Sequence, residues 1–313
     1  MNTKNAILNI LLKSNAYVSG EVIAKRLNIS RVAVNKAVEK LRQDGYVINS
    51  VTNKGYMLET VGGIDANVIK SKTNYSGEVI VLNETVSTNI DAKIIAERGE
   101  TAVVIAKTQT GGKGRMNRKF HSLTGGAYLS VIVKPNLPIA DGVKITTYTA
   151  VAVANVIEKL TGLKVDIKWV NDLYVNGKKI CGILTEASCD FEQNKLKYAV
   201  VGIGVNLDAE TFPLEIENIA TSVYKEGKIK VDKNQFIAEI LNAYSNLEDE
   251  IKRGNYLQEY KRRCFILGKK VTVYQNDYSY LATALDVTES GALKVDKNGE
   301  IITVSSGEVS IKL

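Results

Sequence analysis

Glycines and cationic side chains are interleaved in one short segment of the chain, residues 109–120. The segment reads Gln-Thr-Gly-Gly-Lys-Gly-Arg-Met-Asn-Arg-Lys-Phe, with three glycines within four residues and four cations. Glycines let backbone N–H groups converge on an anion, and lysine and arginine add positive charge. The spacing fits neither a Walker A loop nor a Gly-x-Gly-x-x-Gly fingerprint. The pattern predicts a loop that binds a phosphate or a carboxylate, with a basic surface loop as the alternative.

An aspartate and a lysine stand on either side of a predicted hairpin further along the chain. Asp172 closes a predicted strand, and Lys179 follows the dipeptide Asn176-Gly177. Asn-Gly between two apolar segments is the strongest short hairpin signal. The hairpin would bring the carboxylate and the ammonium group across from each other. Such a pair can hold a metal-bound triphosphate, with the carboxylate acting through Mg²⁺.

Two other segments offer groups that suit a small polar ligand. Ser87, Thr88 and Asn89 place two hydroxyls and an amide at the start of a predicted helix, where side-chain capping is the alternative role. Residues 202–206 include Gly202 and Gly204, and glycines permit a ligand to approach the backbone closely.

A stretch from residue 64 to about 264 contains the elements that must position these groups. Strands are predicted at residues 79–82, 103–106, 127–134, 165–169 and 197–207, and helices at residues 88–98, 145–160 and 233–253. Because strands and helices do not alternate regularly, a mixed sheet in an α+β domain is favoured over a doubly wound fold.

The first 60 or so residues have the pattern of a DNA-binding domain. Helices are predicted from residue 5 to 13, from a Ser19 cap to about residue 27, and from a Ser30 cap to residue 44. Two short strands, residues 46–51 and 56–58, follow. Three helices and a hairpin in this length predict a winged helix-turn-helix. Residues 61–63, Val-Gly-Gly, are the predicted linker.

The predicted recognition helix carries side chains that can contact DNA. Arginine and asparagine make bidentate contacts to guanine and adenine edges, and lysine neutralises phosphate. The predicted DNA-binding residues are Ser30, Arg31, Val32, Asn35, Lys36 and Lys54, with Lys40 and Arg42 as further candidates. A solvated basic face on a domain that mediates protein contacts is the alternative.

The rest of the sequence narrows the class of protein. Short strands with turns at Asn276-Asp277, Ser290-Gly291 and Asn298-Gly299 predict a small β-barrel or sandwich from residue 268 to the end. No apolar run approaches the roughly 20 residues that span a bilayer, and no signal-peptide core follows the first residues. These features predict a cytoplasmic protein with no membrane partner. The net charge of +7 is a mild hint of an anionic partner.

Cysteine and histidine counts exclude two kinds of site. The three cysteines, Cys181, Cys189 and Cys264, lie at wide and unpatterned spacing, which argues against a disulfide framework and a zinc site. His121 is the single histidine, so a mechanism that needs two histidines is excluded. No residue is assigned as a permanent metal ligand.

The four candidate segments, in this order and between these flanking domains, resemble those of bacterial biotin–protein ligases over essentially the whole chain. With the winged helix in front, the resemblance extends to the family's bifunctional ligases that also repress the biotin operon. It implies an α+β fold in three domains. These are a winged helix-turn-helix at residues 1–62, a mixed-sheet ligase domain like that of class II synthetases at residues 63–265, and an SH3-like β-barrel at residues 266–313.

The resemblance also implies a role for individual residues. Contacts to biotin are implied for Ser87, Thr88, Asn89, Gln109, Gly111, Gly112, Lys113, Gly114, Arg115, Tyr128, Ser130, Lys179, Gly182 and Leu184. Contacts to the nucleotide are implied for Arg115, Arg118, Asn171, Lys179 and Asn206. Catalytic roles are implied for Lys179, Arg115, Arg118, Lys113 and Asp172.

The chain departs from the family pattern at three places. Lys113 stands where the loop usually has arginine, Phe120 where tryptophan is usual, and Val170 where proline is common. Lysine keeps the charge but loses the planar fork of arginine, which predicts weaker retention of an adenylate. None of the three changes removes an ionisable group that the chemistry needs.

The implied reaction has two steps. Biotin and Mg·ATP form biotinyl-5′-AMP and pyrophosphate, and a lysine of the biotin carboxyl carrier protein then takes the biotin and releases AMP. The adenylate would also favour a homodimer that reads a palindromic operator. The alternatives are a lipoate–protein ligase, a biotin-sensing transcription factor without catalysis, and a ligase whose winged helix mediates protein contacts.

Overall fold

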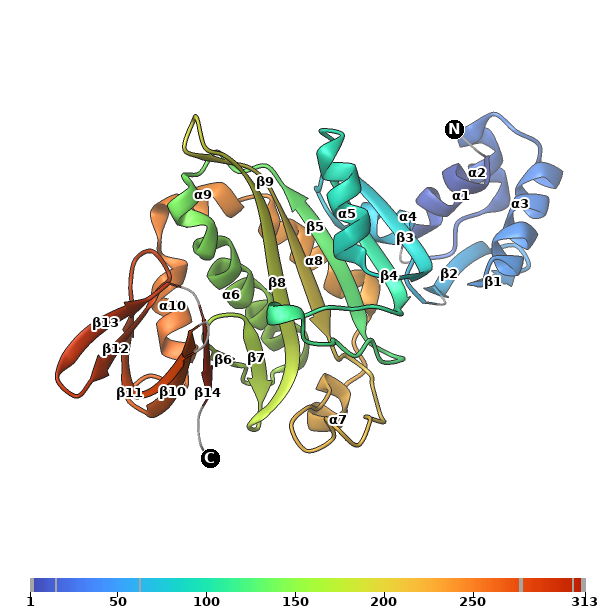
Figure 1. Cartoon of the computed structure of the whole chain (residues 1–313). Coiled ribbons are helices and arrows are strands. Elements are labelled where there is room, and N and C mark those ends of the chain that lie inside the picture. Colours follow the sequence, from blue (N-terminus) through green and yellow to red (C-terminus); the bar gives the residue numbers. More distant parts are fainter. Residues whose placement is uncertain (1–2, 15, 62, 276–277, 306, 311–313) are drawn as a thin grey trace.

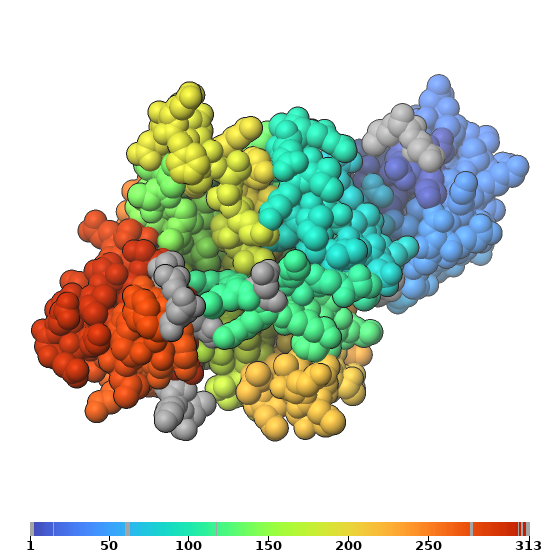
Figure 2. Space-filling view, in the orientation of Figure 1, coloured from blue at the N-terminus to red at the C-terminus, as the bar shows by residue number. Residues whose placement is uncertain are grey.

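The chain forms three consecutive groups of elements in the computed structural model, which describes residues 3–14, 16–61, 63–275, 278–305 and 307–310. Three helices and a hairpin come first, a seven-stranded sheet with its helices follows, and a five-stranded sheet comes last (Figure 1). The space-filling view places the first group at one end of the molecule and the last at the other (Figure 2). Gly62 of the predicted linker and the predicted Asn276-Asp277 turn lie outside the described residues.

The first group has the elements that the sequence predicts for a winged helix-turn-helix. Its helices are α1 (Thr3–Leu12), α2 (Gly20–Leu27) and α3 (Arg31–Gln43), and its hairpin pairs β1 (Tyr46–Val51) with β2 (Gly55–Val61). Ser19 and Ser30 cap α2 and α3, because their hydroxyls accept hydrogen bonds from backbone N–H groups of the first turn. The apolar helix faces meet in a core that holds Ile7, Leu11, Ile23, Val34, Val38 and Leu41.

A mixed seven-stranded sheet occupies the middle of the chain, as predicted. Its order is β3-β4-β5-β9-β8-β7-β6, in which β3 and β4 are parallel and the other neighbours are antiparallel. The strands are β3 (Glu78–Thr85), β4 (Ala102–Gln109), β5 (Ala127–Val133), β6 (Asp166–Lys168), β7 (Asp172–Val175), β8 (Lys178–Asp190) and β9 (Lys195–Val205). Strand β9 is central, and β5 and β8 are its neighbours.

Helices cover both faces of this sheet. Val104 and Val200 pack in a cluster with helix α5 (Thr88–Glu97), whereas their chain neighbours Val103 and Val201 pack in the large core with α6 (Gly142–Thr161). This alternation is expected for strands that are buried on both faces. The other helices are α4 (Ala66–Lys72), α7 (Val223–Gly227), α8 (Lys233–Tyr244), α9 (Leu247–Arg253) and α10 (Tyr256–Arg263), with 3-10 turns at Arg115–Asn117 and Ile139–Asp141.

The prediction of one helix over residues 233–253 is wrong. The structure has two helices, α8 and α9, separated by Ser245 and Asn246. The N–H groups of these two residues bond to carbonyls three residues back, which closes α8. Asn246 has φ −116° and ψ 12°, outside helical values, and begins α9. Serine and asparagine favour helix ends because their side chains compete for backbone hydrogen bonds.

The last group is an antiparallel sheet with the order β13-β12-β11-β10-β14. Its strands are β10 (Lys270–Gln275), β11 (Tyr278–Val287), β12 (Leu293–Lys297), β13 (Glu300–Val304) and β14 (Glu308–Ser310). Its apolar residues, among them Val273 and Val295, belong to the same core as the central sheet. Trp169 Nε1 donates to Gly291 O at 3.0 Å and joins the two sheets. The SH3-like barrel form of this group remains a prediction.

Helix α4 belongs to two cores at once. Val68 packs in the N-terminal core, whereas Ile69 packs in the core of the central sheet. Asp65 caps the helix and also accepts a short hydrogen bond from the Tyr46 hydroxyl on β1. Asp65 N donates to Asn234 Oδ1 on α8 at 2.8 Å. The segment between the first two groups is therefore tied to both of them.

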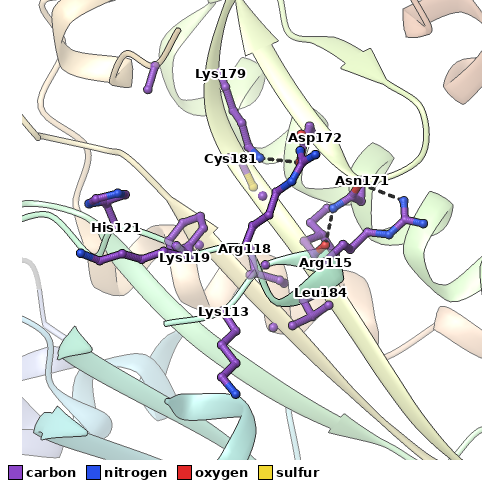
Figure 3. A pocket seen from close by; sticks show the side chains of 18 of the residues that line it. Lys113, Arg115, Arg118, Lys119, His121, Asn171, Asp172, Lys179, Cys181 and Leu184 are labelled. Atoms are coloured by element: carbon purple, nitrogen blue, oxygen red, sulfur yellow. Dashed lines mark hydrogen bonds and ion pairs between the residues drawn. The ribbon is translucent and has the colours of Figure 1, made fainter. Parts of the chain in front are cut away.

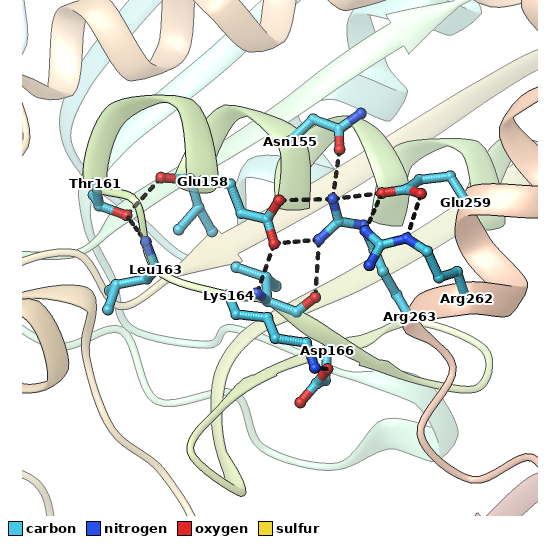
Figure 4. A network of polar contacts seen from close by, with 11 residues as sticks. Asn155, Glu158, Thr161, Leu163, Lys164, Asp166, Glu259, Arg262 and Arg263 are labelled. Atoms are coloured by element: carbon cyan, nitrogen blue, oxygen red, sulfur yellow. Dashed lines mark hydrogen bonds and ion pairs between the residues drawn. The ribbon is translucent and has the colours of Figure 1, made fainter.

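A buried arginine joins α10 to α6 (Figure 4). Arg263 is 3% exposed, and its guanidinium donates to both carboxylate oxygens of Glu158 at 2.5 and 2.8 Å and to Val165 O at 3.0 Å. It also pairs with Glu259 at 2.7 Å and donates to Asn155 Oδ1 at 2.9 Å. The hydrogen bond from Arg263 lowers the pKa of Glu158. The network fixes the segment that leads into β6.

We predict that Arg263→Ala lowers the free energy of unfolding by about 3 kcal/mol, because it removes the buried partner of two carboxylates. Arg262→Ala is the matched control, since Arg262 pairs with the same Glu259 from a side chain that is 59% exposed. The control should lose less than about 1 kcal/mol. Urea unfolding of both variants measures the difference, and equal losses would contradict the role given to the buried network.

Candidate active site

A cavity of about 310 Å³ lies over the central strands of the large sheet. Its lining comes from the start of α5, the Gly-rich loop, strands β8 and β9, the segment around Ile219, and Val309 on β14. The predicted residues that line it are Ser87, Thr88, Asn89, Gln109, Lys113, Gly114, Arg115, Arg118, Asn171, Asp172, Lys179, Gly182, Leu184 and Asn206. The structure thus brings together segments that are more than 200 residues apart in the sequence, from Ser87 to Val309.

Two glycines of β9 make the floor of the cavity. A Cβ atom on Gly202 would lie 2.2 Å from Asn89 Oδ1, and one on Gly204 would lie 2.3 Å from the Phe120 ring. The sequence predicted that these glycines admit a ligand to the backbone. In this structure they admit two side chains of the protein itself, which then form part of the cavity wall.

Neutral hydroxyls and amides form one end of the cavity. Gln109 Oε1 accepts from Thr88 N at 2.9 Å and from the Thr88 hydroxyl at 3.1 Å. Ser130 Oγ lies 2.7 Å from Thr88 Oγ1 and donates to Asn89 Oδ1 at 2.6 Å. Ser87 stands at the N-cap position of α5, but its side chain makes no capping hydrogen bond. The capping alternative is therefore wrong, and the Ser87 hydroxyl remains available at the cavity.

Glu186 orients the amide of Asn89, a role that sequence reasoning missed. Asn89 Nδ2 donates to Glu186 Oε2 at 2.7 Å, and Glu186 also makes an ion pair with Lys93 one turn further along α5. The Asn89 side chain is therefore held through both its oxygen and its nitrogen. No local pattern in the sequence indicates this pairing, because β8 and α5 lie about 90 residues apart.

Charged side chains form the other end of the cavity (Figure 3). Lys179 Nζ lies 2.7 Å from Asp172 Oδ1, across the β7–β8 hairpin that the sequence predicts. Arg118 extends toward this pair, whereas Lys113 points away from it in the same view. The position of Lys113 means that its implied catalytic role requires the loop to rearrange.

Arg115 lies between the Gly-rich loop and two other parts of the chain. Its guanidinium donates to Asn171 Oδ1 at 3.5 Å and to Gly307 O at 2.7 Å. Asn171 in turn donates to Ile183 O at 2.7 Å. Arg115 is thus positioned against the turn after β6 and against the start of β14.

Four of the predicted residues do not line the cavity but support its wall. Gly111 N and Gly112 O form backbone hydrogen bonds at the base of the loop, at 2.8 and 2.9 Å. Ser130 is buried behind Thr88 and Asn89, at the neutral end of the cavity. Tyr128 is fully buried, donates to Leu123 O at 2.6 Å, and meets the Phe120 ring edge-on.

Several apolar wall residues were not predicted. Ile216, Ile219 and Ala220 come from an irregular segment, which Lys179 anchors because its N–H donates to Ile219 O at 2.9 Å. Burial raises the pKa of the Cys181 thiol, which therefore stays neutral at this wall. These residues could not be predicted, because an irregular loop and a single buried side chain leave no recognisable pattern in a single sequence.

A buried acceptor in the cavity has no partner within the described chain. Asn206 is 8% exposed, and its Nδ2 donates to Thr221 O at 3.1 Å while its Oδ1 accepts no hydrogen bond there. A buried polar atom of this kind is costly unless a ligand or water satisfies it. Asn206 Oδ1 is therefore an acceptor that a hydrogen-bond donor of a ligand or a water molecule would satisfy.

The described residues hold no cluster of three or more His, Cys, Asp or Glu side chains that would bind a metal ion. Asp172 is the carboxylate of the cavity. Within the same residues, no helix is both long and apolar enough to cross a membrane.

A second candidate surface lies on α3. Arg31, Val32, Asn35, Lys36 and Lys40 are exposed there, and so are Lys54 and Ser30. Residues 1–62 hold nine lysines and arginines against four acidic residues, so five of the seven net positive charges lie in this part. Arg42 is engaged within the domain, because its guanidinium donates to Ile48 O at 2.6 and 3.0 Å.

Three family models match consecutive parts of the chain. They are an HTH domain over residues 3–57, the Biotin/lipoate A/B protein ligase family over residues 76–206, and the Biotin protein ligase C terminal domain over residues 266–312. Each model falls within one of the three groups of elements described above.

Two curated proteins and one solved structure are similar over most of their length. "Bifunctional ligase/repressor BirA" of Bacillus subtilis (strain 168) is 31% identical over 95% of this chain and 94% of the relative. The protein of the same name from Escherichia coli (strain K12) is 28% identical over 99% and 98%. The Aquifex aeolicus biotin protein ligase, solved with biotin and ATP, has a TM-score of 0.64 at 24% identity over 74% of this chain and 97% of that one. This last likeness concerns the fold alone.

The floor of the cavity gives a prediction about packing. Gly202→Ala places a methyl group 2.2 Å from Asn89 Oδ1 and should lower the free energy of unfolding by about 1–3 kcal/mol through overpacking. Gly142→Ala is the control, because the nearest atom to its Cβ is 4.0 Å away. Thermal and urea unfolding compare the two, and a Gly202→Ala protein as stable as the control would show that Asn89 can move freely.

Proposed function

The chain belongs to the bifunctional ligase/repressor family, and we propose that it attaches biotin to a lysine of an acceptor protein and represses transcription. The proposed ligase activity rests on one observation, that a single cavity has a neutral polar end and a charged end. A ligand with an uncharged hydrogen-bonding head and an anionic tail fits such a cavity, and biotin has this form.

The neutral end suits the ureido ring of biotin, which has two N–H donors and one carbonyl acceptor. We assign Ser87, Thr88, Asn89 and Gln109 to this ring, with Ser130 and Glu186 holding them in place. Gly111, Gly112, Gly114, Gly182 and Leu184 would surround the rest of the molecule, and Tyr128 would support Phe120 behind it. The biotin carboxylate would then extend toward Lys179.

The charged end suits the triphosphate of ATP. We assign Lys179, Arg115 and Arg118 to phosphate oxygens, Asn171 and Asn206 to the nucleoside, and Lys113 to the closed form of the loop. Asp172 suits Mg²⁺, because this ion is usually held by one or two carboxylates together with substrate phosphates. When bound, Mg²⁺ neutralises part of the phosphate charge.

The proposed reaction needs positioning and charge stabilisation rather than a covalent intermediate on the protein. In the first step a carboxylate oxygen of biotin bonds to the α-phosphorus, and the bond to the pyrophosphate leaving group breaks. Lys179, Arg115 and Arg118 stabilise the negative charge that grows on the phosphoryl oxygens. Holding both substrates in line contributes much of the remaining rate.

In the second step the acceptor supplies the nucleophile. The neutral amine of its lysine attacks the carbonyl carbon of the mixed anhydride, and AMP leaves with the electron pair of the broken bond. The Gly-rich loop must open for substrates and close to exclude water, because the anhydride hydrolyses. We infer that the acceptor is a biotin carboxyl carrier protein, which places the reaction in the cytoplasm.

The repressor half rests on the winged helix-turn-helix and its exposed basic side chains. Arg31 and Asn35 can read base edges, Val32 can contact a thymine methyl group, and Lys36 and Lys54 can neutralise phosphates. We propose that the adenylate-bound chain forms a homodimer, because two recognition helices at a fixed spacing read a palindromic operator.

The test of the ligase proposal uses the purified full chain with biotin, Mg·ATP and a biotin carboxyl carrier domain. We expect the acceptor to gain the mass of one biotin on a lysine, and only when ATP is present. Biotin binding without mass gain would favour a biotin sensor that lacks catalysis. Mass gain with lipoate in place of biotin would favour a lipoate ligase, and no biotin binding would overturn the proposal.

Lys179→Ala should lower the rate of adenylate formation at least about 100-fold, since it removes a cation aimed at the reacting phosphate. Lys178→Ala is the matched control, because the neighbouring ammonium group contacts Glu217 O at the surface instead. Pyrophosphate release in single turnovers measures the rate, and circular dichroism checks that both variants fold. An unchanged rate for Lys179→Ala would remove it from the catalytic residues.

Asn35→Ala should weaken operator binding by about 1–3 kcal/mol and leave binding to unrelated DNA unchanged, because a base contact is lost. Lys54→Ala should instead weaken binding to both DNAs and reduce the salt slope by about 0.9. The operator probe is a fragment selected from random DNA by the protein with biotin and Mg·ATP. Equal effects of Asn35→Ala on both DNAs would show that Asn35 does not read sequence.

A further inference from the structure

A backbone carbonyl next to the C-terminal strand β14 contacts the Gly-rich loop. Gly307 O accepts the hydrogen bond from the Arg115 guanidinium at 2.7 Å, although the two residues lie 192 positions apart. Two residues later, Val309 is fully buried and lines the cavity. The start of β14 thus reaches both the wall of the cavity and a side chain of the loop.

Position 307 can hold only glycine without displacing this segment. Gly307 has φ +123°, a conformation that residues with a Cβ rarely adopt, and a Cβ atom here would lie 2.5 Å from Tyr274 O. The next three residues pair with β10, where Tyr274, Val273 and Thr272 oppose positions 308, 309 and 310. The sheet therefore determines where the Gly307 carbonyl points.

Backbone hydrogen bonds hold the base of the Gly-rich loop, whereas a side chain holds its tip. At the base, Phe120 N donates to Gly112 O at 2.9 Å, and Gly114 N donates to Arg118 O at 2.7 Å. At the tip, Met116 has φ +53°, is 61% exposed and lines the cavity, so the loop makes its turn at the edge of the cavity. Arg115, next to this turn, is the residue through which the tip reaches the C-terminal sheet.

We propose that Gly307 is a positioning residue for the loop: its carbonyl holds the Arg115 guanidinium against Asn171 and keeps the loop over the cavity. The C-terminal sheet then controls how often the loop opens. This inference rests on the proposed function only for its consequence, which is that the adenylate leaves more slowly while the contact is made.

Trypsin cleavage tests the positioning role without any ligand. Trypsin must bind the side chain of the residue before the cleaved bond. Cleavage after Arg115 therefore requires that the Arg115 guanidinium leave Gly307 O. Gly307→Ala should raise the rate of this cleavage about tenfold, the factor expected for losing a hydrogen bond to a charged group. Cleavage after Lys54, in the exposed β1–β2 turn, is the internal reference in the same digest.

Gly299→Ala is the matched control for backbone strain. Gly299 also has a positive φ, +92°, in the same sheet, but a Cβ atom there meets nothing within 4 Å. This variant should digest like the unmodified chain. Cleavage after Arg115 that is equal in Gly307→Ala, Gly299→Ala and the unmodified chain would overturn the proposal.

A second arm measures the adenylate. Gly307→Ala should raise the rate of adenylate release about tenfold and lower kcat/KM for adenylate formation by a similar factor, because Arg115 is then held less firmly at the phosphate site. In an Arg115→Gln background, Gly307→Ala should add nothing further, because the side chain that it positions is gone. Independent, additive effects of the two substitutions would show that Gly307 acts only on the stability of its sheet, and would overturn the proposal.

The digest and the adenylate measurement test the anchor and the proposed function separately. If the unmodified chain forms no adenylate, the proposed function fails, while the digest still decides whether Gly307 holds Arg115. If Gly307→Ala does not fold, the digest of Arg115→Gln decides instead. Its cleavage after Lys113 and Arg118 should rise about tenfold, and a loop that stays protected there would contradict the anchor.

Discussion

The two-residue period of β9 is the constraint on which the cavity depends. Gly202 and Gly204 lie on the face that meets Asn89 and Phe120, while Val201 and Val205 lie in the core with α6. A slip of one residue in the pairing of β9 would exchange these faces and press valines against the two side chains. The antiparallel registers with β5 and β8 therefore fix the floor, and through it the positions of α5 and the Gly-rich loop.

The two ends of the cavity differ because different segments border the floor on its two sides. Helix α5 brings hydroxyls and an amide to one side, where short hydrogen bonds fix their directions. The β7–β8 hairpin and the loop bring charges to the other side, where Lys179 and Asp172 neutralise each other until a substrate arrives. A neutral end organised by hydrogen bonds and a charged end organised by ion pairs suit a reaction that joins a carboxylate to a phosphate.

The sequence predicted what local patterns encode. The α+β class, the helix-turn-helix, the mixed sheet and the C-terminal antiparallel sheet are confirmed, because periodicity, capping serines and the Asn176-Gly177 hairpin all act over a few residues. The contributions of Glu186, Ile219 and Val309 were missed, because they come from segments that meet only in the folded chain. The break between α8 and α9 was missed because an apolar pattern continues across Ser245 and Asn246.

Helix α4 makes the two halves of the molecule less separable than their sequence suggests. A chain cut near residue 62 would keep the whole catalytic sheet, yet Val68 would lose its neighbours and the Asp65 carboxylate would lose the Tyr46 hydroxyl. The fragment would begin with a helix whose apolar face is partly exposed to solvent, and exposed apolar surface promotes self-association. A free-standing version of the enzyme would therefore need a redesigned first turn of α4.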